Sequence, residues 1–204
     1  MSSNNKRPTD SRLAETRREQ VLNAAADCFR KHGYHGASMA EIACAAAMSP
    51  GHIYHYFESK DAIIEAIIAK DAEELFSIMR EFQDRRGELL DAIIDGLHIS
   101  VDQYLDTERG ALLLEMLAEA ARNPKVAALL RSCDALMRQR LRDLLTGPRG
   151  MLSQCDTDEL DARMEVINAI FCGLLIRALV NPSLKREALI AALRPVLRVA
   201  LSPT

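Results

Sequence analysis

Tryptophan is absent from this chain of 204 residues, and only 4% of the residues are aromatic. Glycine and proline are also scarce, with 9 and 7 residues, whereas 49% of the chain is hydrophobic. A β-sandwich or β-barrel needs aromatic and β-branched strands, so this composition argues against both. Few turn residues and many good helix formers predict helices with short connections.

Paired cysteines and long apolar runs are missing as well. The five cysteines form no CxxC pair, which argues against a disulfide framework and favours a reducing compartment. The longest apolar stretch, residues 166–180, is shorter than the ~20 residues of a membrane span. Residues 1–12 lack the apolar segment of a secretion signal. We therefore expect a cytoplasmic protein without a membrane partner.

The charge is unevenly distributed along the chain. The formal net charge is −3, yet residues 1–60 carry eight Lys and Arg against six Asp and Glu. Four of the five histidines also lie there, at His32, His35, His52 and His55. A mildly basic, histidine-rich segment on an acidic body hints at an anionic partner for that segment.

Capping signals and apolar spacing predict an all-α fold of about nine helices. Gly33 is expected as a left-handed cap after a first helix over residues 12–31. Ser38 with Glu41 has the pattern of a capping box, and that helix should end near residue 46. Ser49 followed by Pro50 predicts a helix running to about residue 57. A long helix should open at residues 58–61, and others are expected over 87–105, 109–122, 124–145, 157–180 and 184–201.

The two short helices and the tight turn at residues 47–49 have the arrangement of a helix-turn-helix, whose second helix enters the major groove of DNA. Ile53 and Phe57 should face inward, against Ile42 and Ala46. The outward residues should be Pro50, Gly51, His52, Tyr54, His55 and Tyr56.

Three segments carry a resemblance to a known family: residues 29–34 (FRKHGY), 38–43 (SMAEIA) and 49–60 (SPGHIYHYFESK). In order, spacing and residue type they resemble the DNA-binding head of the TetR family of transcriptional repressors, over about residues 14–74. The resemblance implies a flexible arm over 1–11 and a DNA-binding domain over 12–60, with the helix-turn-helix at about 37–56. Residues 61–204 would form a ligand-binding and dimerisation domain.

The resemblance also implies roles for individual residues. A phosphate would meet the helix start at Ser38, tyrosine hydroxyls would bind phosphates or sugars, and Lys60 would neutralise a phosphate. Arg12, Arg17 and Arg18 would add contacts to the DNA backbone. The full set of expected DNA contacts is Ser38, Ser49, Pro50, Gly51, His52, Tyr54, His55, Tyr56 and Lys60.

The expected recognition helix lacks the usual bidentate readers of bases. Residues 50–57 contain no Arg, Lys, Asn or Gln, so specificity should depend partly on the shape of the DNA. The spacing of the four head histidines, with Cys28 and Cys44 nearby, also allows a zinc site. Because the helix-turn-helix packs Cys28 inside and turns His52 and His55 outward, we expect no metal and no cofactor.

Polar and flexible side chains on the apolar helices of the body suggest a cavity for a small-molecule effector. Its expected contacts are His98, Met116, Met137, Asn168 and Phe171, with ordinary core packing as the alternative. Glu115 and Glu119 are expected to be solvated charges or charges beside a hinge.

Residues 166–180 are apolar around nearly the whole helix, so that helix must be covered on both sides. This pattern predicts a homodimer through a four-helix bundle, with a buried core helix of a monomer as the alternative. The expected interface residues are Ile170, Leu174, Arg177, Leu189, Leu193, Val196 and Leu197.

Together these features predict a ligand-responsive repressor that binds a palindromic double-stranded DNA operator as a homodimer and is released by an unidentified small molecule. The alternative is a constitutive DNA-binding or architectural protein without an effector. We expect no enzyme, because the sequence contains no persuasive nucleophile arrangement, phosphate loop or carboxylate pair.

Overall fold

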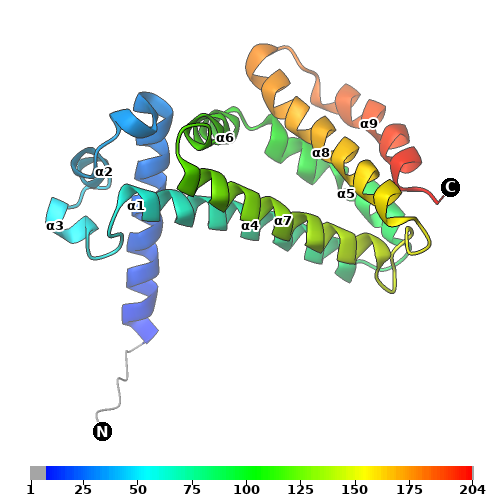
Figure 1. Ribbon diagram of the computed structural model, residues 1–204, viewed down its shortest axis with the longest axis horizontal. Helices are drawn as coiled ribbons and strands as arrows, with labels where there is room; N and C mark the ends of the chain where they lie inside the picture. Colours follow the sequence, from blue (N-terminus) through cyan, green and yellow to red (C-terminus); the bar gives the residue numbers. More distant parts are fainter. Residues whose placement is uncertain (1–7, 204) are drawn as a thin grey trace, which may run out of the picture. The chain divides into compact units, whose positions relative to one another are not determined.

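The computed structural model describes residues 8–203, with side chains from residue 12. Residues 1–7 of the predicted flexible arm lie outside the described residues, whereas its residues 8–11 form the first turn of α1. Within them the fold is all-helical, as predicted (Figure 1). The helices are α1 (Pro8–Gly36), α2 (Met39–Ala45), α3 (Pro50–Ile53), α4 (Lys60–Asp84), α5 (Leu89–Leu105), α6 (Thr107–Ala120), α7 (Pro124–Thr146), α8 (Thr157–Val180) and α9 (Arg186–Leu201). No described helix is long and apolar enough to cross a membrane.

The two predicted starts of the short helices are confirmed. The Ser38 hydroxyl accepts from the Glu41 N–H at 3.2 Å, and the Glu41 carboxylate accepts from the Ser38 N–H at 2.7 Å, which completes the capping box of α2. The Ser49 hydroxyl accepts from the His52 N–H at 3.2 Å, and Pro50 opens α3. Both caps satisfy backbone N–H groups that a helix start leaves without partners.

Two features in and beside the helix-turn-helix differ from the prediction. Helix α3 ends at Ile53 instead of residue 57, and residues 54–56 continue as a turn in which the Tyr56 N–H donates to the Ile53 carbonyl at 3.0 Å. Gly33 does have a positive φ of 71°, but its ψ of 166° is not that of a left-handed helical cap. It is a kink within α1, in a region of backbone conformation that essentially only glycine adopts.

The chain divides into two units. The first contains the residues up to Ala69 together with Glu115–Ala127, and the second contains Lys70–Leu114 and Ala128–Thr204. Helices α4, α6 and α7 each contribute residues to both units. The division differs from a single boundary at residue 60, because the end of α6 groups with the helix-turn-helix.

The core of the first unit holds the helix-turn-helix in place. Helix α2 packs on α1 and α3. Ile42, Ala46, Ile53 and Phe57 are buried, as predicted. A helix of four residues has no stability of its own, so α3 depends on this packing. Burying a side chain such as Ile53 stabilises the fold by about 1.5–3 kcal/mol.

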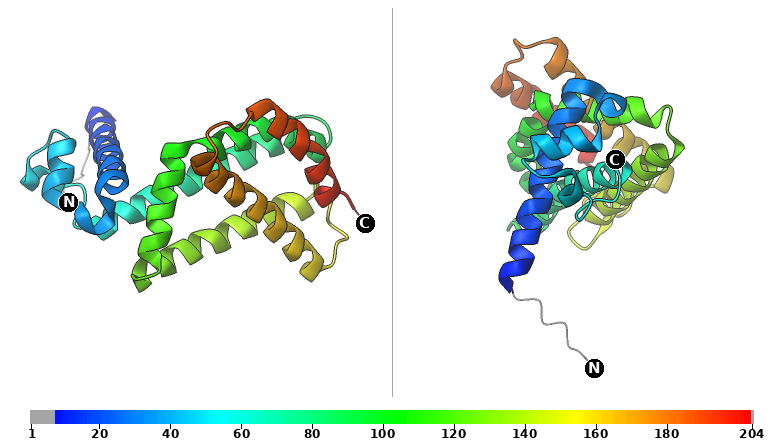
Figure 2. Two further views of the ribbon diagram at one scale, coloured as in Figure 1. Left: turned by 90° about the horizontal axis from the view of Figure 1, so that it is seen from above. Right: turned by 90° about the vertical axis from the view of Figure 1, so that its left-hand side faces the viewer.

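In the second unit, α5 packs against both α8 and α9 (Figure 2). Three of the residues expected at a dimer interface, Leu174, Leu193 and Leu197, lie in this core of the single chain. Ile170 and Leu189 are half-buried against the same cluster. These five side chains pack against α5 within the single chain.

Several large apolar side chains of α8 and α9 remain exposed. Ile176 is 49% exposed and Val196 is 47% exposed. Of the expected interface residues, Val196 and Arg177 belong to the exposed set. The large apolar residues exposed on α8 and α9 are Val166, Ile176, Leu179, Val180, Val196 and Val199.

Candidate nucleic-acid interface and effector cavity

The structure places the predicted recognition residues on one exposed surface of the first unit. Pro50, Gly51, His52, Tyr54 and His55 are exposed, and Tyr56 is half-buried. Between them, Ile53 and Phe57 turn into the core. This alternation follows from the helical turn of residues 50–53 and from the tighter turn after it, which carries Phe57 back to the core.

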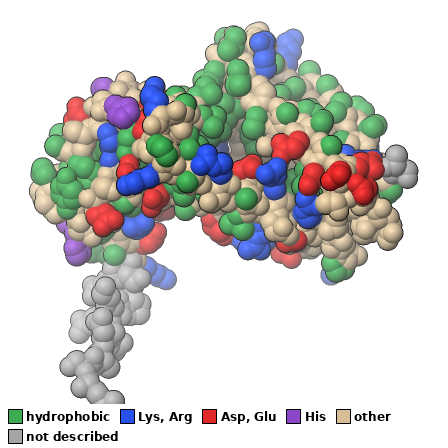
Figure 3. All heavy atoms as spheres, in the orientation of Figure 1, with side chains coloured by type: hydrophobic (Ala, Val, Ile, Leu, Met, Phe, Trp, Pro, Cys, Tyr) green, Lys and Arg blue, Asp and Glu red, His purple; other side chains and the backbone are tan. Residues whose placement is uncertain are grey.

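Three of these rings, those of His52, His55 and Tyr56, form one group. The Tyr56 hydroxyl lies 3.4 Å from His52 Nε2, and the centroids of these two rings are 5.3 Å apart. The His55 ring meets Tyr56 edge-on, with centroids 5.4 Å apart. Imidazole and phenol groups can donate and accept hydrogen bonds, so this group suits contacts to base edges and phosphates. The histidines in view in Figure 3 lie on the first unit.

Glycine at position 51 is not required by the protein's own packing. A Cβ built there would meet no atom within 4 Å. The missing side chain instead leaves the backbone at the start of α3 open to close approach by a partner.

Side chains of α1 support the ends of the helix-turn-helix. Arg18 Nη1 donates to the Tyr56 carbonyl at 3.3 Å, and its guanidinium lies 4.3 Å from the centre of the Phe57 ring. Gln20 Nε2 donates to the Ala46 carbonyl at 2.7 Å. Arg17 donates to Gln20 at 2.8 Å. Arg17 and Arg18, expected to reach the DNA backbone, are thus engaged inside the protein.

Lys60 is engaged in the same way. Its ammonium donates to the carbonyl of Tyr34 and, at 2.8 Å, to that of Ala37. It also lies 4.2 Å from the centre of the Tyr34 ring. Burial lowers the pKa of Lys60. Since an ammonium has three protons, at most one is left for the phosphate contact expected of Lys60.

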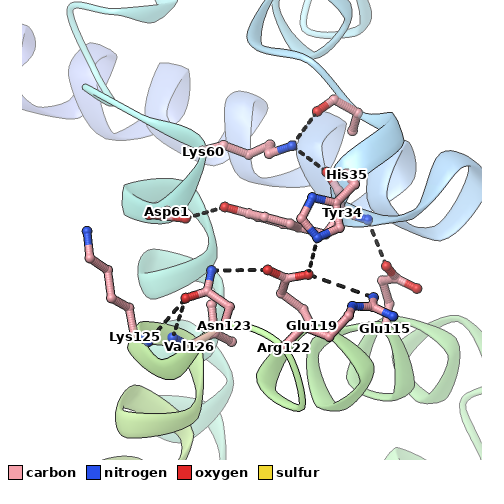
Figure 4. A network of polar contacts seen from close by, with 11 residues as sticks. Tyr34, His35, Lys60, Asp61, Glu115, Glu119, Arg122, Asn123, Lys125 and Val126 are labelled. Atoms are coloured by element: carbon pink, nitrogen blue, oxygen red, sulfur yellow. Dashed lines mark hydrogen bonds and ion pairs between the residues drawn. The ribbon is translucent and has the colours of Figure 1, made fainter.

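A network of polar contacts joins the ends of α1 and α6 within the first unit (Figure 4). The carboxylate of Glu115 accepts from the Tyr34 N–H at 2.7 Å. A Cβ on Gly33 would stand only 3.1 Å from that same carboxylate oxygen. The Tyr34 hydroxyl donates to Asp61, and burial together with this bond raises the pKa of Tyr34.

Glu119 is the buried member of this network, with 1% of its surface exposed. Asn123 Nδ2 donates to its Oε1 at 3.0 Å, and His35 Nε2 lies 2.9 Å from its Oε2. The expectation of a solvated charge is therefore wrong for Glu119. Sequence spacing gave no signal for the contact between Tyr34 and Glu115, because 81 positions separate them.

The zinc alternative finds no support in the described residues, where no three or more His, Cys, Asp or Glu are grouped to hold a metal ion. Cys28 is buried, as predicted, and burial raises the pKa of its thiol.

The second unit contains a half-open cavity of about 180 Å³ between α4, α5, α7, α8 and α9. Of the residues expected to contact an effector, Met137, Asn168 and Phe171 line it. His98 is exposed elsewhere on α5, with its Nδ1 2.9 Å from the Asp95 carbonyl. Met116 is buried on α6 in the first unit. Neither residue lines the cavity, so the prediction is wrong for His98 and Met116.

Comparison with known proteins gives matches for both parts of the chain. The model of the bacterial regulatory proteins of the tetR family matches residues 21–67. The model of the C-terminal part of BetI-type transcriptional repressors matches residues 101–201. The HTH-type transcriptional regulator UidR of Escherichia coli K12 is 37% identical over 140 residues, which cover 64% of this chain and 67% of UidR.

Solved structures have the same fold. Salmonella enterica GusR is 30% identical, with a TM-score of 0.73, and the match covers 91% of this chain and 95% of GusR. FadR from Bacillus subtilis, solved in complex with stearoyl-CoA, is similar in fold alone, with 18% identity, a TM-score of 0.70 and coverage of 88% of this chain and 96% of FadR. The exposed helix-turn-helix and these relatives show that the chain belongs to the TetR family of DNA-binding transcriptional regulators.

Proposed function

We propose that this protein is a ligand-responsive transcriptional repressor that acts in the cytoplasm. It binds a palindromic operator as a homodimer and releases it when a small molecule occupies the second unit. The observation that carries the proposal is the group formed by exposed His52, Tyr54 and His55 and half-buried Tyr56. This group lies on a buried scaffold of Ile53 and Phe57.

The contacts to DNA divide into two kinds. His52 and His55 read base edges, with Pro50 and Gly51 against the floor of the groove. Tyr54 and Tyr56, the helix starts at Ser38 and Ser49, and the remaining proton of Lys60 contact the sugar–phosphate backbone. Each imidazole forms fewer hydrogen bonds to a base than an arginine does, so the width and flexibility of the DNA contribute to specificity.

The exposed apolar face of α8 and α9 supports the homodimer. Large apolar side chains gathered on one face mark an interaction surface. A second copy of the same face covers them as a four-helix bundle, with α8 and α9 from each subunit. Two heads then meet two half-sites about 34–36 Å apart, which is why the operator is palindromic.

The cavity supports a role for an effector and favours it over a constitutive architectural protein. Helix α4 lines the cavity with Leu75, Ile78, Met79 and Phe82, and the same helix begins in the first unit at Lys60. A molecule in the cavity therefore acts on the helix that continues into the DNA-binding unit. It lowers operator affinity only if it binds the released state more tightly.

The test is a footprint of the region upstream of the protein's own gene, followed by titration of the footprinted duplex. The triple variant His52→Ala, Tyr54→Ala, His55→Ala removes three exposed side chains and should weaken binding at least about 100-fold. Gln139→Ala, at an exposed position of α7, serves as the matched control and should bind normally. Undiminished binding by a folded, dimeric triple variant contradicts the proposal.

A further inference from the structure

The interior of the cavity is apolar and adaptable. Its wall includes Ile78, Met79 and Phe82 of α4 and Met137 and Leu141 of α7. Methionine side chains are flexible and adjust to the shape of a bound molecule. A charged group placed against such a wall loses its hydration without gaining a partner, which is strongly unfavourable.

Two uncharged polar side chains of α5 also face this space. Ser100 and Tyr104 are one helical turn apart and both line the cavity. Within the described part of the chain, neither hydroxyl has a hydrogen-bonding partner in the protein, while the Tyr104 ring packs on Phe171 with centroids 5.1 Å apart. Burial raises the pKa of Tyr104, so its hydroxyl keeps its proton and can donate.

The charged side chains of the cavity wall pair with one another. Arg138 Nη1 lies 2.6 Å from Glu165, and Arg138 Nε lies 3.2 Å from Asp134. Each of these three side chains is about half exposed. Arg138 is the one cation among the described cavity residues, and two carboxylates already hold it. An anionic ligand would meet excess negative charge, and a cationic one would find both carboxylates paired.

The volume sets how much of a ligand the cavity can enclose. An engineered protein cavity of about 150 Å³ with aliphatic and aromatic walls binds benzene. The present cavity, at about 180 Å³, is slightly larger. It therefore accommodates one six-membered ring with a short substituent.

We propose that the cavity binds an uncharged, mainly apolar molecule of that size, with a hydroxyl or carbonyl oxygen bound by Tyr104 and Ser100. Asn168 of α8, which also lines the cavity, offers an amide as a further hydrogen-bonding group. That this molecule is the effector rests on the function proposed above, whereas its binding to the protein does not require DNA.

Four probes of similar size separate charge from shape: benzyl alcohol, benzylamine, benzoate and toluene. Their affinities for the full-length protein are measured at pH 7 by ligand-observed NMR or calorimetry. Benzyl alcohol should bind about tenfold more tightly than benzoate and benzylamine, which must lose their hydration in the apolar interior. Equal or tighter binding of either charged probe overturns the proposal, and so does the absence of binding by all four.

Tyr104→Phe keeps the ring and removes only the hydroxyl. It should weaken benzyl alcohol binding about five- to tenfold and leave toluene binding unchanged, because toluene has no group for that hydroxyl to bind. Ser100→Ala should act in the same direction, and His98→Ala, outside the cavity, should change neither affinity. An equal loss for toluene and benzyl alcohol in Tyr104→Phe would overturn the assigned hydrogen bond.

The same preparations are titrated with operator DNA, which separates this proposal from the function on which it rests. Benzyl alcohol that binds with the expected selectivity but leaves the DNA complex intact supports the ligand class and contradicts the effector role. A protein that binds its operator but none of the four probes refutes the ligand class and leaves the repressor proposal in place.

Discussion

At Gly33, both the backbone conformation and the side chain of Glu115 from α6 require a residue without a Cβ. Its φ of 71° and ψ of 166° are unfavourable for any residue with a Cβ, and the Glu115 carboxylate occupies the adjacent space. The sequence identified the glycine as special, because a glycine after a helical stripe indicates a positive φ. It gave no indication that the glycine also admits a carboxylate from α6.

Gly33→Ala should therefore destabilise the protein by about 1–3 kcal/mol through backbone strain, with an added cost from displacing Glu115. Urea unfolding measures the change. Gly87→Ala is the matched control, because Gly87 has a φ of 96° but a Cβ at that position would meet no atom within 4 Å. If both substitutions have the same effect, the contact with Glu115 contributes nothing.

At the scale of single helices, local sequence determined where α2 and α3 begin, since the caps lie within three residues of the groups that they satisfy. The end of α3 was not predictable in this way. Residues 54–57 have no glycine to stop a helix, and the turn forms because Phe57 has to reach the core. Contacts across the fold override local helix propensity there.

The capping box of α2 gives stability a defined pH dependence. Hydrogen bonds from the Ser38 backbone N–H and side chain lower the pKa of Glu41 below its usual value near 4.5. A lowered pKa means that the stabilisation is present above about pH 4.5 and disappears as the pH falls through the folded-state value.

Glu41→Gln should accordingly reduce stability at pH 7 and make less difference at pH 3. Urea unfolding of both proteins at the two pH values tests the sign. Glu58→Gln, on an exposed residue outside the capping box, is the control. A gap between wild type and Glu41→Gln that widens toward pH 3 would contradict the assignment.

For the whole molecule, the sequence predicted the all-α fold and the helix-turn-helix, because both follow from local periodicity and motif order. It assigned the faces of α8 less well. Fifteen residues that are apolar nearly all round do not reveal which side meets α5 and which side stays outside. The same limit explains why Leu174 was expected at an interface.

Ile176→Glu tests the proposed interface. A carboxylate at the centre of an apolar contact between two copies loses its hydration, so dimerisation should weaken at least about tenfold, measured by sedimentation equilibrium. Operator affinity should fall with it, because one head meets only one half-site. Leu13→Glu places the same charge on an exposed leucine of α1 and should leave the dimer intact. If Ile176→Glu dimerises as strongly as the wild type, the dimer interface does not include this face of α8.

The engagement of Arg18 and Lys60 with backbone carbonyls has a consequence for binding in different ionic conditions. Each phosphate that a protein neutralises displaces condensed counterions, and this release makes binding sensitive to salt. The protein's own backbone holds Arg18 and leaves Lys60 at most one N–H for a phosphate, so this head should displace few counterions. Its affinity for the operator should therefore fall only slightly as the potassium concentration rises. The complex should persist at salt concentrations at which regulators with more phosphate contacts dissociate.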